Sequence, residues 1–314
     1  MIKEFNNRKI ADKHAEFITG QELRKYLARK VKKYVGESPT VFDGACGSGQ
    51  LEEHIGASFI KGVEIQEKAC QVFKENYPNS SVDNISFFNF KSDEQYDCVV
   101  MNYPFSLKFK ELSEEEQKNI QDEFSWKRSG VVDDIFILKS LNYTKRFAFY
   151  IGFPGIRYRK AEAKLRELLS GQIAEFNIIR NAFEDTAIEV IFLVIDKHKQ
   201  TEGVCKEIYD CKTKTIVHSE ETSDADEWEQ VVEPIPEPEK IDPTVVETEA
   251  QAKVIREIRF QLNFTAMVAD LEDNQKLLTE FIRKIRREVD DFERSKANET
   301  NSSICCRNND SAWT

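Results

Sequence analysis

The fold of this chain is decided by one stretch of sequence, Thr40-Val-Phe-Asp43-Gly44-Ala45-Cys46-Gly47-Ser48-Gly49-Gln50-Leu51. Its apolar run predicts a short strand, its glycines predict a sharp turn, and Leu51 to Ile55 is expected to form a helix. Glycines in such a turn let the backbone approach a ligand where a side chain would clash. One strand later, Glu64 in Gly62-Val63-Glu64-Ile65 can accept both hydroxyls of a ribose. Together these features predict an adenosine site at the edge of an α/β sheet.

Three nucleotide ligands compete for this glycine turn. A dinucleotide fingerprint requires a third glycine at position 52, where the charge of Glu52 would repel a pyrophosphate. A P-loop requires Gly-Lys-Ser/Thr, which does not follow the turn. Asp43 before the turn suits a cation with an amino group, and S-adenosylmethionine carries an ammonium and a sulfonium. We therefore expect S-adenosylmethionine as the cofactor, with an ordinary glycine-rich turn as the alternative.

Apolar runs and helical patterns alternate through residues 39–200. The predicted strands are Thr40–Phe42, Phe59–Glu64, Ile85–Phe90, Cys98–Met101, Arg146–Phe153, Ala174–Ile179 and Glu189–Asp196. The predicted helices between them include Gln66–Tyr77, Glu114–Phe124, Ile135–Leu141 and Ala161–Ser170. This alternation is typical of a doubly wound, Rossmann-like α/β fold whose parallel sheet is covered on both faces.

A second motif, Asn102-Tyr103-Pro104-Phe105, follows the predicted strand Cys98–Met101. Chemistry in such folds takes place where parallel strands end. The Asn102 side-chain oxygen and a neighbouring backbone carbonyl can accept the hydrogens of a planar exocyclic amine, which frees its lone pair for methylation. Phe105 can stack on the base, and Pro104 stiffens the loop. The alternative is a polar and aromatic turn without catalytic function.

The two motifs resemble those of amino-group DNA methyltransferases. Asp43-Gly-Ala-Cys-Gly-Ser-Gly49 is similar to their Asp-Pro-Ala-Cys-Gly-Ser-Gly cofactor motif, and Asn102-Tyr-Pro-Phe105 to their Asn-Pro-Pro-Phe/Tyr catalytic motif. The order of motifs resembles the gamma class, above all the adenine-N6 modification subunits of type I restriction-modification systems. The resemblance covers about residues 14–198. It implies a methyltransferase that acts on the N6 amino group of a flipped adenine in DNA.

The resemblance also implies roles for further residues. Glu16-Phe17-Ile18-Thr19-Gly20-Gln21 is similar to the Phe-x-Thr-Pro cofactor lid, which places Thr19 near the methionine end of the cofactor. Phe88-Asn89-Phe90 takes the place of the motif that contacts the adenine of the cofactor. Phe183 and the strand 188–196 resemble the late motif that holds the flipped base together with Phe105. The expected cofactor-binding residues are Phe17, Thr19, Asp43, Ala45, Cys46, Gly47, Gly49, Glu64, Ile65, Asn89 and Phe90.

Two residues depart from the family pattern. Gly44 replaces a proline in the cofactor motif, which we expect only to loosen the turn. Tyr103 replaces the first proline of the catalytic motif, so we expect a freer loop there. Because the residue at position 103 acts through its backbone carbonyl, activity can survive the change. Reduced activity, or a non-catalytic subunit that binds the cofactor, is the alternative.

The remaining segments are predicted from composition and periodicity. Residues 1–38 are expected to form a helical segment that includes the lid. Residues 201–250 contain four of the eight prolines and predict an acidic linker or strap. Residues 251–294 predict a helical hairpin and 295–314 a disordered tail. The hairpin has an apolar stripe formed by Leu271, Leu278, Ile282, Ile285, Val289 and Phe292.

Charge is segregated along the chain. The net charge is −11, and residues 201–250 alone hold 15 acidic and 4 basic side chains, which accounts for all of it. An acidic chain is therefore compatible with a DNA partner. Arg157-Tyr158-Arg159-Lys160 is the best local basic patch for phosphates, with a solvated helix start as the alternative. The 251–294 helices are expected to fold back on the catalytic domain or to dock a specificity subunit or second protomer.

The alternative functions are methylation of a release-factor glutamine at N5 or of an RNA guanine at N2. The seven cysteines show no metal-ligand spacing, so we expect no metal site. No apolar run approaches the roughly 20 residues of a membrane span, and the N-terminus has no apolar signal region. We therefore expect a cytoplasmic protein with no membrane partner.

Overall fold

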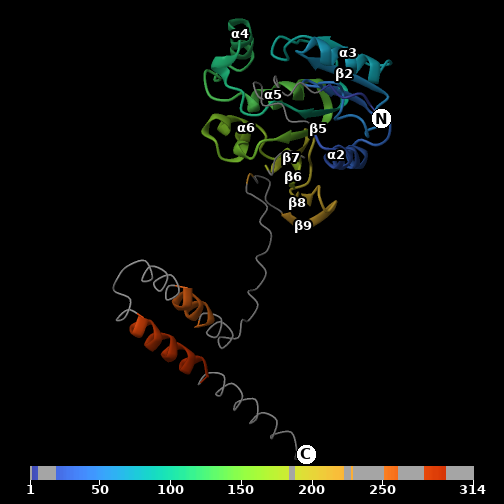
Figure 1. Cartoon of the computed structure of the whole chain (residues 1–314). Helices are drawn as coiled ribbons and strands as arrows, with labels where there is room; N and C mark the ends of the chain where they lie inside the picture. The colour runs from blue at the N-terminus through green and yellow to red at the C-terminus, as the bar shows by residue number, and fades with distance from the viewer. Residues whose placement is uncertain are drawn as a thin grey trace, which may run out of the picture. The chain divides into compact units, whose positions relative to one another are not determined.

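The computed structural model describes residues 2–5, 19–183, 188–222, 228, 251–260 and 279–294. The chain divides into two compact units, Met1–Pro234 and Ile235–Thr314, which are treated separately (Figure 1). Phe17 of the predicted lid, most of the linker after residue 222 and the tail 295–314 lie outside the described residues. No helix among the described residues is long and apolar enough to cross a bilayer.

The first unit is a mixed α/β domain, which confirms the predicted fold class. Its strands are β1 (Thr40–Asp43), β2 (Phe59–Glu64), β3 (Ser81–Asn84), β4 (Tyr96–Asn102), β5 (Thr144–Gly152), β6 (Ile173–Arg180), β7 (Val190–Asp196), β8 (Val204–Asp210) and β9 (Thr215–Thr222). Its helices are α2 (Gln21–Tyr34), α3 (Glu67–Asn76), α4 (Glu114–Glu123), α5 (Asp133–Ser140) and α6 (Ala163–Leu168). Short 3-10 turns occupy Phe109–Glu111, Leu141–Tyr143, Pro154–Arg157 and Lys160–Glu162.

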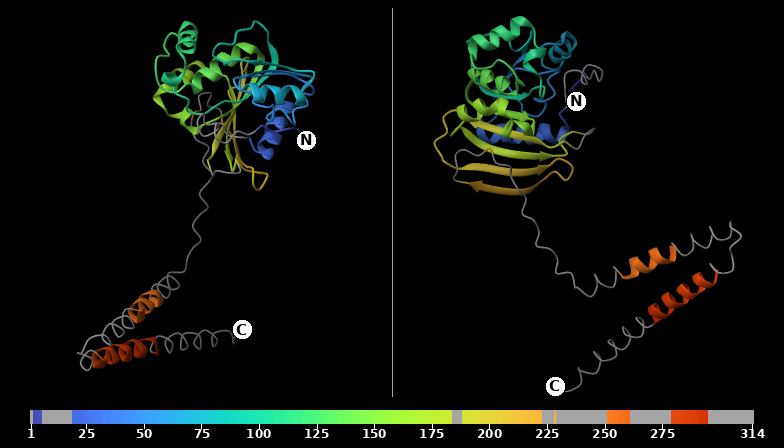
Figure 2. Two further views of the ribbon diagram at one scale, coloured as in Figure 1. Left: turned by 45° about the horizontal axis from the view of Figure 1, so that its top comes forward. Right: turned by 90° about the vertical axis from the view of Figure 1, so that its left-hand side faces the viewer.

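The described strands form one sheet in the order β3-β2-β1-β4-β5-β7-β6-β8-β9 (Figure 2). The prediction of an all-parallel sheet was wrong, because β7 runs antiparallel to both β5 and β6. The reason is the short connection between β6 and β7, since a parallel pair needs a crossover of a dozen or more residues. Chain order reverses between β1 and β4, and this switch point is where ligands bind in open α/β sheets.

Helices cover both faces of the sheet, and β5 shows why. Phe147 and Phe149 point to one face, where both rings contact Tyr34 of α2. Tyr150, the residue after Phe149, points to the other face, and its hydroxyl forms a hydrogen bond with that of Ser140 of α5 at 2.8 Å. Because side chains alternate along a strand, an unbroken apolar strand requires a helix on each side.

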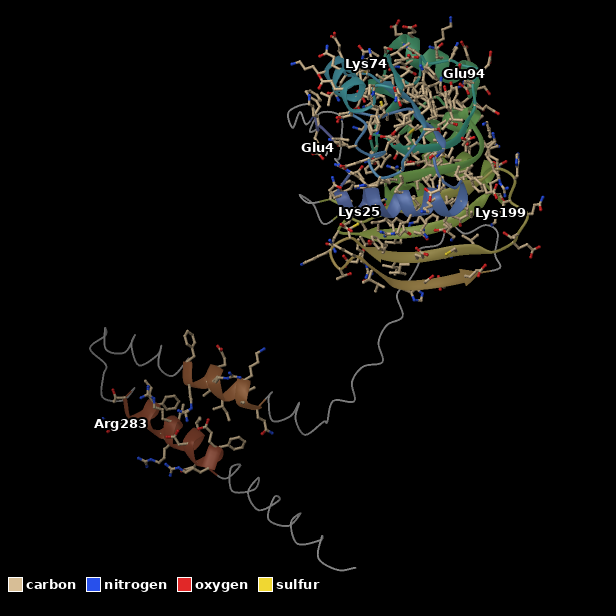
Figure 3. The ribbon with its side chains drawn as sticks, turned by 90° about the vertical axis from the view of Figure 1, so that its right-hand side faces the viewer. Glu4, Lys25, Lys74, Glu94, Lys199 and Arg283 are labelled. Atoms are coloured by element: carbon tan, nitrogen blue, oxygen red, sulfur yellow. The ribbon has the colours of Figure 1, made fainter. Side chains whose placement is uncertain are left out.

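The hairpin β8–β9 extends the sheet into the segment that was predicted to be a linker. That prediction was wrong for residues 204–222, because the acidic residues there are not all solvated. Glu207 accepts hydrogen bonds from Lys30 and from the Tyr26 hydroxyl of α2, both at 2.8 Å. Lys30 also lies 2.5 Å from Glu175 of β6. Figure 3 shows α2, which carries the labelled Lys25, lying alongside the strands of the sheet.

Two further local predictions were wrong. Residues 85–90 form a turn rather than a strand, in which the backbone N–H groups of Asn89 and Phe90 donate to Ser86. The phenylalanines of this turn are buried among other aromatic rings, and this burial produced the apolar run. Leu51 to Ile55 forms consecutive turns rather than a helix, since five residues are too few for a stable helix.

The second unit contains described helices at residues 251–260 and 279–294. Arg259 of the first helix pairs with Asp290 at 2.8 Å and with Glu293 at 2.6 Å, both on the second. Ile282 of the predicted stripe is buried, whereas Phe292 is 47% exposed. Leu271 and Leu278 lie outside the described residues, so the complete hairpin stays a prediction.

Candidate functional site

The strand register brings the two predicted motifs to one edge of the sheet. Asp43 ends β1, Glu64 ends β2 and Asn102 ends β4, and these three neighbouring strands are parallel. The carboxyl ends of parallel strands face the same way, so their last side chains converge. The candidate site therefore lies at the switch point between β1 and β4.

The glycine turn (Asp43 to Gly49) and the loop after β2 hold one another. The backbone N–H groups of Gly47 and Gln66 donate to the two Glu64 carboxylate oxygens at 3.0 and 2.7 Å. Gly47 and Gly49 have φ angles of +53° and +82°, which other residues rarely adopt. Gly44 leaves no room for a side chain, because a Cβ there would lie 2.7 Å from Phe87 and Met101. The turn is thus tightly packed at position 44, not loosened as expected.

Two buried carboxyl groups lie behind the glycine turn, and we call Asp43 and Glu52 the acid pair. Asp43 Oδ1 accepts from the Ala45 N–H at 2.8 Å. When one carboxyl group of the pair is protonated, Asp43 and Glu52 hydrogen-bond one another. When both are ionised, Asp43 Oδ2 and both Glu52 oxygens have no donor among the described residues, and Gln50 Nε2 is also buried without a partner there. Burial, together with the neighbouring charge of Glu52, raises the pKa of Asp43 well above its usual range. Burial also raises the pKa of Glu52 to about 7.

Glu52 was considered in the sequence only as an obstacle to pyrophosphate, and its place in the site was missed. A short polar turn after the glycines places the residue in the interior, where both of its oxygens need a donor or a cation. A positively charged ligand group would satisfy the acid pair. These carboxylate acceptors fit the ammonium group at the amino acid end of S-adenosylmethionine.

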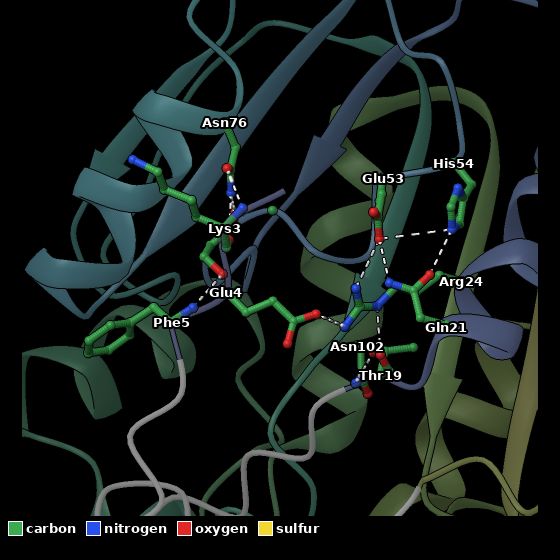
Figure 4. A network of polar contacts seen from close by, with 12 residues as sticks. Lys3, Glu4, Phe5, Thr19, Gln21, Arg24, Glu53, His54, Asn76 and Asn102 are labelled. Carbon is green, nitrogen blue, oxygen red and sulfur yellow. Dashed lines mark hydrogen bonds and ion pairs between the residues drawn. The ribbon is translucent and has the colours of Figure 1, made fainter. Parts of the chain in front are cut away.

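The loop from Asn102 to Ser106, which we call the catalytic loop because it holds the predicted catalytic motif, contacts Thr19, the first residue of the described segment 19–183. Asn102 Nδ2 donates to Thr19 Oγ1 at 2.9 Å (Figure 4). The Thr19 carbonyl accepts from Arg24 Nε at 2.6 Å, and Arg24 also contacts Glu53 at 3.0 Å. The structure therefore brings together Thr19 and Asn102, which are 83 residues apart. The predicted lid residue Phe17 lies outside the described residues.

Tyr103 anchors the catalytic loop. Its side chain is 1% exposed, and its ring stacks on Phe136 with 5.4 Å between centroids. A Cβ added to Gly152 would lie 2.7 Å from the Tyr103 hydroxyl, so glycine is needed at the end of β5. The expectation of a freer loop was wrong, because side-chain packing takes over the restraint that proline provides through its ring.

The loop is also held at its far end by an ion pair whose carboxylate is buried. Ser106, with a φ of +59°, donates its backbone N–H to Asp133 Oδ1 at 2.9 Å. Arg159 donates to Ser106 Oγ at 3.0 Å and to Asp133 Oδ2 at 2.8 Å. Arg159 also lies 2.6 Å from Glu162. Of the predicted basic patch, Arg159 is therefore committed to the loop, and Asp133 is a supporting residue that the sequence did not reveal.

The predicted base-holding and adenine-contacting residues take different places. Phe105 and Phe183 are buried, with 4% and 7% of their surface exposed. Ile65 is 66% exposed beside Glu64. The Phe90 ring packs against Phe42 in the core, 5.6 Å between centroids, and Asn89 accepts from Asn119 at 3.0 Å. Phe90 is therefore not brought to the site.

Asn84 lies at the same edge of the sheet as Glu64. It ends β3, in register with Glu64, and its Nδ2 donates to the carbonyls of Glu64 and Ile65 at 2.9 and 3.0 Å. The sequence did not indicate Asn84, because the third strand was predicted at Ile85–Phe90 and its end was therefore expected six residues later.

One group of side chains among the described residues has ligand atoms close enough to hold a metal, namely Glu175, Cys205 and Glu207. Lys30 already lies between the two carboxylates, at 2.5 and 2.8 Å. Lys33 and Tyr34 donate to the second oxygen of Glu175. The group is an ion-pair network that attaches α2 to β6 and β8.

Comparison of the sequence with known proteins identifies the family of the chain. The sequence profile described as N-6 DNA Methylase matches residues 1–275. The chain is 25% identical over 225 residues to the type I restriction enzyme MpnII methylase subunit of Mycoplasma pneumoniae, which covers 59% of this chain and 40% of the relative. It is 37% identical over 78 residues to a ribosomal protein L11 methyltransferase of Thermotoga neapolitana, covering 23% of this chain and 30% of that one. The chain thus spans less than half the length of these curated relatives.

Solved structures share the fold. A type I restriction-modification system methyltransferase subunit from Streptococcus thermophilus has a TM-score of 0.53 at 19% identity, over 63% of this chain and 49% of that one. A structure from work on the assembly of a type I restriction-modification system has a TM-score of 0.54 at 14% identity, over 86% of this chain and 68% of that one. Because the family profile matches most of the sequence, including both motifs, the chain belongs to the N-6 DNA methylase family.

Proposed function

We propose that this protein transfers a methyl group from S-adenosylmethionine to the N6 amino group of adenine in DNA. The observation that carries the proposal is the meeting of Asn102 with the glycine turn and Glu64 at one edge of the sheet. Membership in the N-6 DNA methylase family supports the reaction and the substrate base.

The cofactor would be held by the elements around the glycine turn. The buried oxygens of the acid pair fit its ammonium, and the Glu64 carboxylate fits its ribose hydroxyls. When bound, S-adenosylmethionine supplies an electrophilic methyl group on a positive sulfur. Asn84, at the end of β3, is the described residue best placed to recognise the adenine ring.

The catalytic loop orients the N6 amino group of the target adenine. Asn102 Oδ1 and the backbone carbonyl of Tyr103 accept its two hydrogens, so that the nitrogen lone pair is no longer delocalised into the ring. Burial of Tyr103 and the Ser106–Asp133 hydrogen bond hold these acceptors in place before substrate arrives. No strong base is required, because the sulfonium is a good methyl donor.

Adenine in a duplex must leave the base stack to reach this loop. We assign Phe105 and Phe183 to hold it, as the motifs imply. Both rings are buried in the structure, so base entry requires a rearrangement that uncovers them.

The second unit is the proposed docking element for a specificity subunit or second protomer. Its described helices expose Phe260, Phe281 and Phe292 by 63%, 59% and 47%. Exposed aromatic side chains of this kind mark surfaces that pair with other helices.

Nucleoside analysis by mass spectrometry tests the reaction. The protein is expressed in a host without adenine methylation, and its DNA is digested and compared with that from Asn102→Ala and Asn79→Ala hosts. Asn79 is exposed and serves as the matched control. We expect N6-methyladenine with the wild type and with Asn79→Ala, and a loss of about 100-fold or more with Asn102→Ala.

The same purified protein is then incubated with labelled S-adenosylmethionine and either RNA or total protein. Label in RNA or protein, with none in DNA even when a specificity subunit is co-expressed, would replace DNA by the RNA guanine or release-factor alternative. Failure to bind S-adenosylmethionine in calorimetry would remove the methyltransferase proposal altogether.

A further inference from the structure

We propose that Thr19 is a positioning residue that sets the orientation of the Asn102 amide. The inference rests on the proposed function, in which Asn102 accepts hydrogens of the target amine. It assigns Thr19 a task different from the cofactor contact that the lid motif implies.

An asparagine side chain has two chemically opposite ends. Its Oδ1 accepts hydrogen bonds, whereas its Nδ2 only donates them. The target amine presents N–H groups, so only the oxygen end can serve it. A rotation by 180° about the Cβ–Cγ bond would set N–H against N–H.

In the structure the contact with Thr19 is made by the nitrogen end of the amide. Asn102 Nδ2 donates to Thr19 Oγ1 at 2.9 Å, which is a normal length for such a bond. Because the amide nitrogen is directed toward Thr19, the amide oxygen is directed away from Thr19. This contact holds the amide with its nitrogen toward Thr19 and its oxygen directed away from it.

Thr19 can fix the amide because Thr19 itself is fixed. The residue is 4% exposed, and its β-branched side chain has few rotamers. Its carbonyl accepts from Arg24 Nε at 2.6 Å, and Arg24 is 2% exposed and tied to Glu53 and Glu4 at 3.0 and 2.9 Å (Figure 4). At the next residue, a Cβ on Gly20 would lie 2.9 Å from the Ala182 carbonyl, so the backbone there is closely packed.

Kinetics of Thr19→Val and Thr19→Ser separate this role from a cofactor contact. Valine keeps the shape and removes the acceptor, whereas serine keeps the hydroxyl. We expect kcat to fall about five- to tenfold in Thr19→Val, which is what one neutral hydrogen bond supplies, and to recover to within about twofold in Thr19→Ser. A cofactor contact alone would instead raise the KM for S-adenosylmethionine and leave kcat unchanged, and that result would overturn the inference.

Thr144→Val is the matched control. Thr144 is also a buried threonine with a hydroxyl hydrogen bond, to the Phe147 carbonyl at 2.7 Å, but it lies at the opposite end of β5 from the site. This variant should melt at a lower temperature and keep wild-type kcat. An equal fall of kcat in both variants would show a general effect of lost stability and contradict a positioning role.

A spectrum of the amide tests the contact without activity. In protein labelled with ¹⁵N-asparagine, the Asn102 side-chain signal is identified by its absence in Asn102→Ala. We expect this signal to shift in Thr19→Val and to return in Thr19→Ser. An unchanged signal in Thr19→Val would refute the inference, and this holds even if the wild type methylates no DNA, so the two proposals fail separately.

Discussion

The ring of Tyr103 lies nearly parallel to that of Phe136, at an angle of 9° and with 5.4 Å between centroids. Phe136 belongs to α5, which packs below the catalytic loop. A side chain in the position of the family's proline thus attaches the loop to the domain core. This substitution strengthens the case for an active enzyme, since the backbone carbonyl at position 103 needs a defined direction.

Removal of the Tyr103 ring should therefore cost stability and rate together. We expect Tyr103→Ala to lower the free energy of unfolding by about 3 kcal/mol, as for other buried aromatic residues. Its kcat should fall more than its affinity for S-adenosylmethionine. Tyr103→Phe should keep both, because the hydroxyl is buried without a hydrogen-bond partner among the described residues. Urea unfolding and steady-state kinetics measure the effects, and a fully active Tyr103→Ala would show that the ring does not restrain the loop.

The acid pair predicts a stability that depends on pH. Burial raises the pKa of Glu52 from 4.5 to about 7 in the folded protein. The folded state therefore binds this proton more tightly than the unfolded chain does. The resulting stabilisation is complete below pH 4.5 and is lost as the pH rises through 7. Thermal melting of the protein without cofactor should show this loss between about pH 4.5 and 7.

Glu52→Gln should reduce that dependence to the part that Asp43 contributes, and raise the free energy of unfolding at pH 8 by about 2 kcal/mol. Glu202→Gln, at an exposed position, is the control and should leave the pH profile unchanged. Asp43 and the charge of Arg24 also act on this site. A Glu52→Gln profile that keeps the wild-type slope would place the titration elsewhere.

The affinity for S-adenosylmethionine should depend on the ionisation of the acid pair, and it should rise with pH whereas the stability of the protein falls. A cation favours ionised carboxylates, so S-adenosylmethionine should bind more tightly as the pH rises from 5 to about 7, with release of a proton. Calorimetry in buffers of different ionisation enthalpy measures the proton. An affinity that does not change over this range would separate the cofactor from the acid pair.

Arg159 should act through the catalytic loop and not through DNA phosphates. Arg159→Met leaves the buried Asp133 without its cation, which should cost about 3 kcal/mol of stability and lower kcat. Lys160→Met, at the exposed neighbour, should instead weaken DNA binding and its salt dependence with no change of melting temperature. Wild-type stability in Arg159→Met, with weaker DNA binding, would restore the phosphate role.

Glu64 should contribute to cofactor affinity through two contacts at once. Glu64→Gln keeps the shape but weakens the acceptors for Gly47 and for the ribose, so the Kd for S-adenosylmethionine should rise about tenfold. Glu67→Gln, three residues on and exposed, is the control. An unchanged Kd in Glu64→Gln would leave the ribose without its predicted acceptor.

The parts of the site that could be predicted from the sequence depend on alternation and strand ends. Asp43, Glu64 and Asn102 each close an apolar run, and parallel strands must bring such positions to one edge. Their meeting required no knowledge of side-chain packing. The motifs were identified for the same reason, since each is continuous in the sequence.

Other features arise from contacts between distant segments, which a single sequence does not reveal. The turn of Phe87 to Phe90 has the composition of a strand, and only burial against Phe42 and Phe136 distinguishes it. The sequence predicts that Glu207 belongs to an acidic linker, because its ion pair with Lys30 joins residues that are far apart in the chain. The sequence predicts that Glu52 is exposed, because nothing in the neighbouring residues indicates that the turn places its side chain in the interior.

The contact of Glu207 with Lys30 and Tyr26 has a consequence for engineering. The helix that begins beside Thr19 is secured by a strand that follows residue 200, so a catalytic module cut at that point would lose an anchor of its own active site. A new target-reading domain should be fused after Thr222, where the last described strand of the sheet is complete.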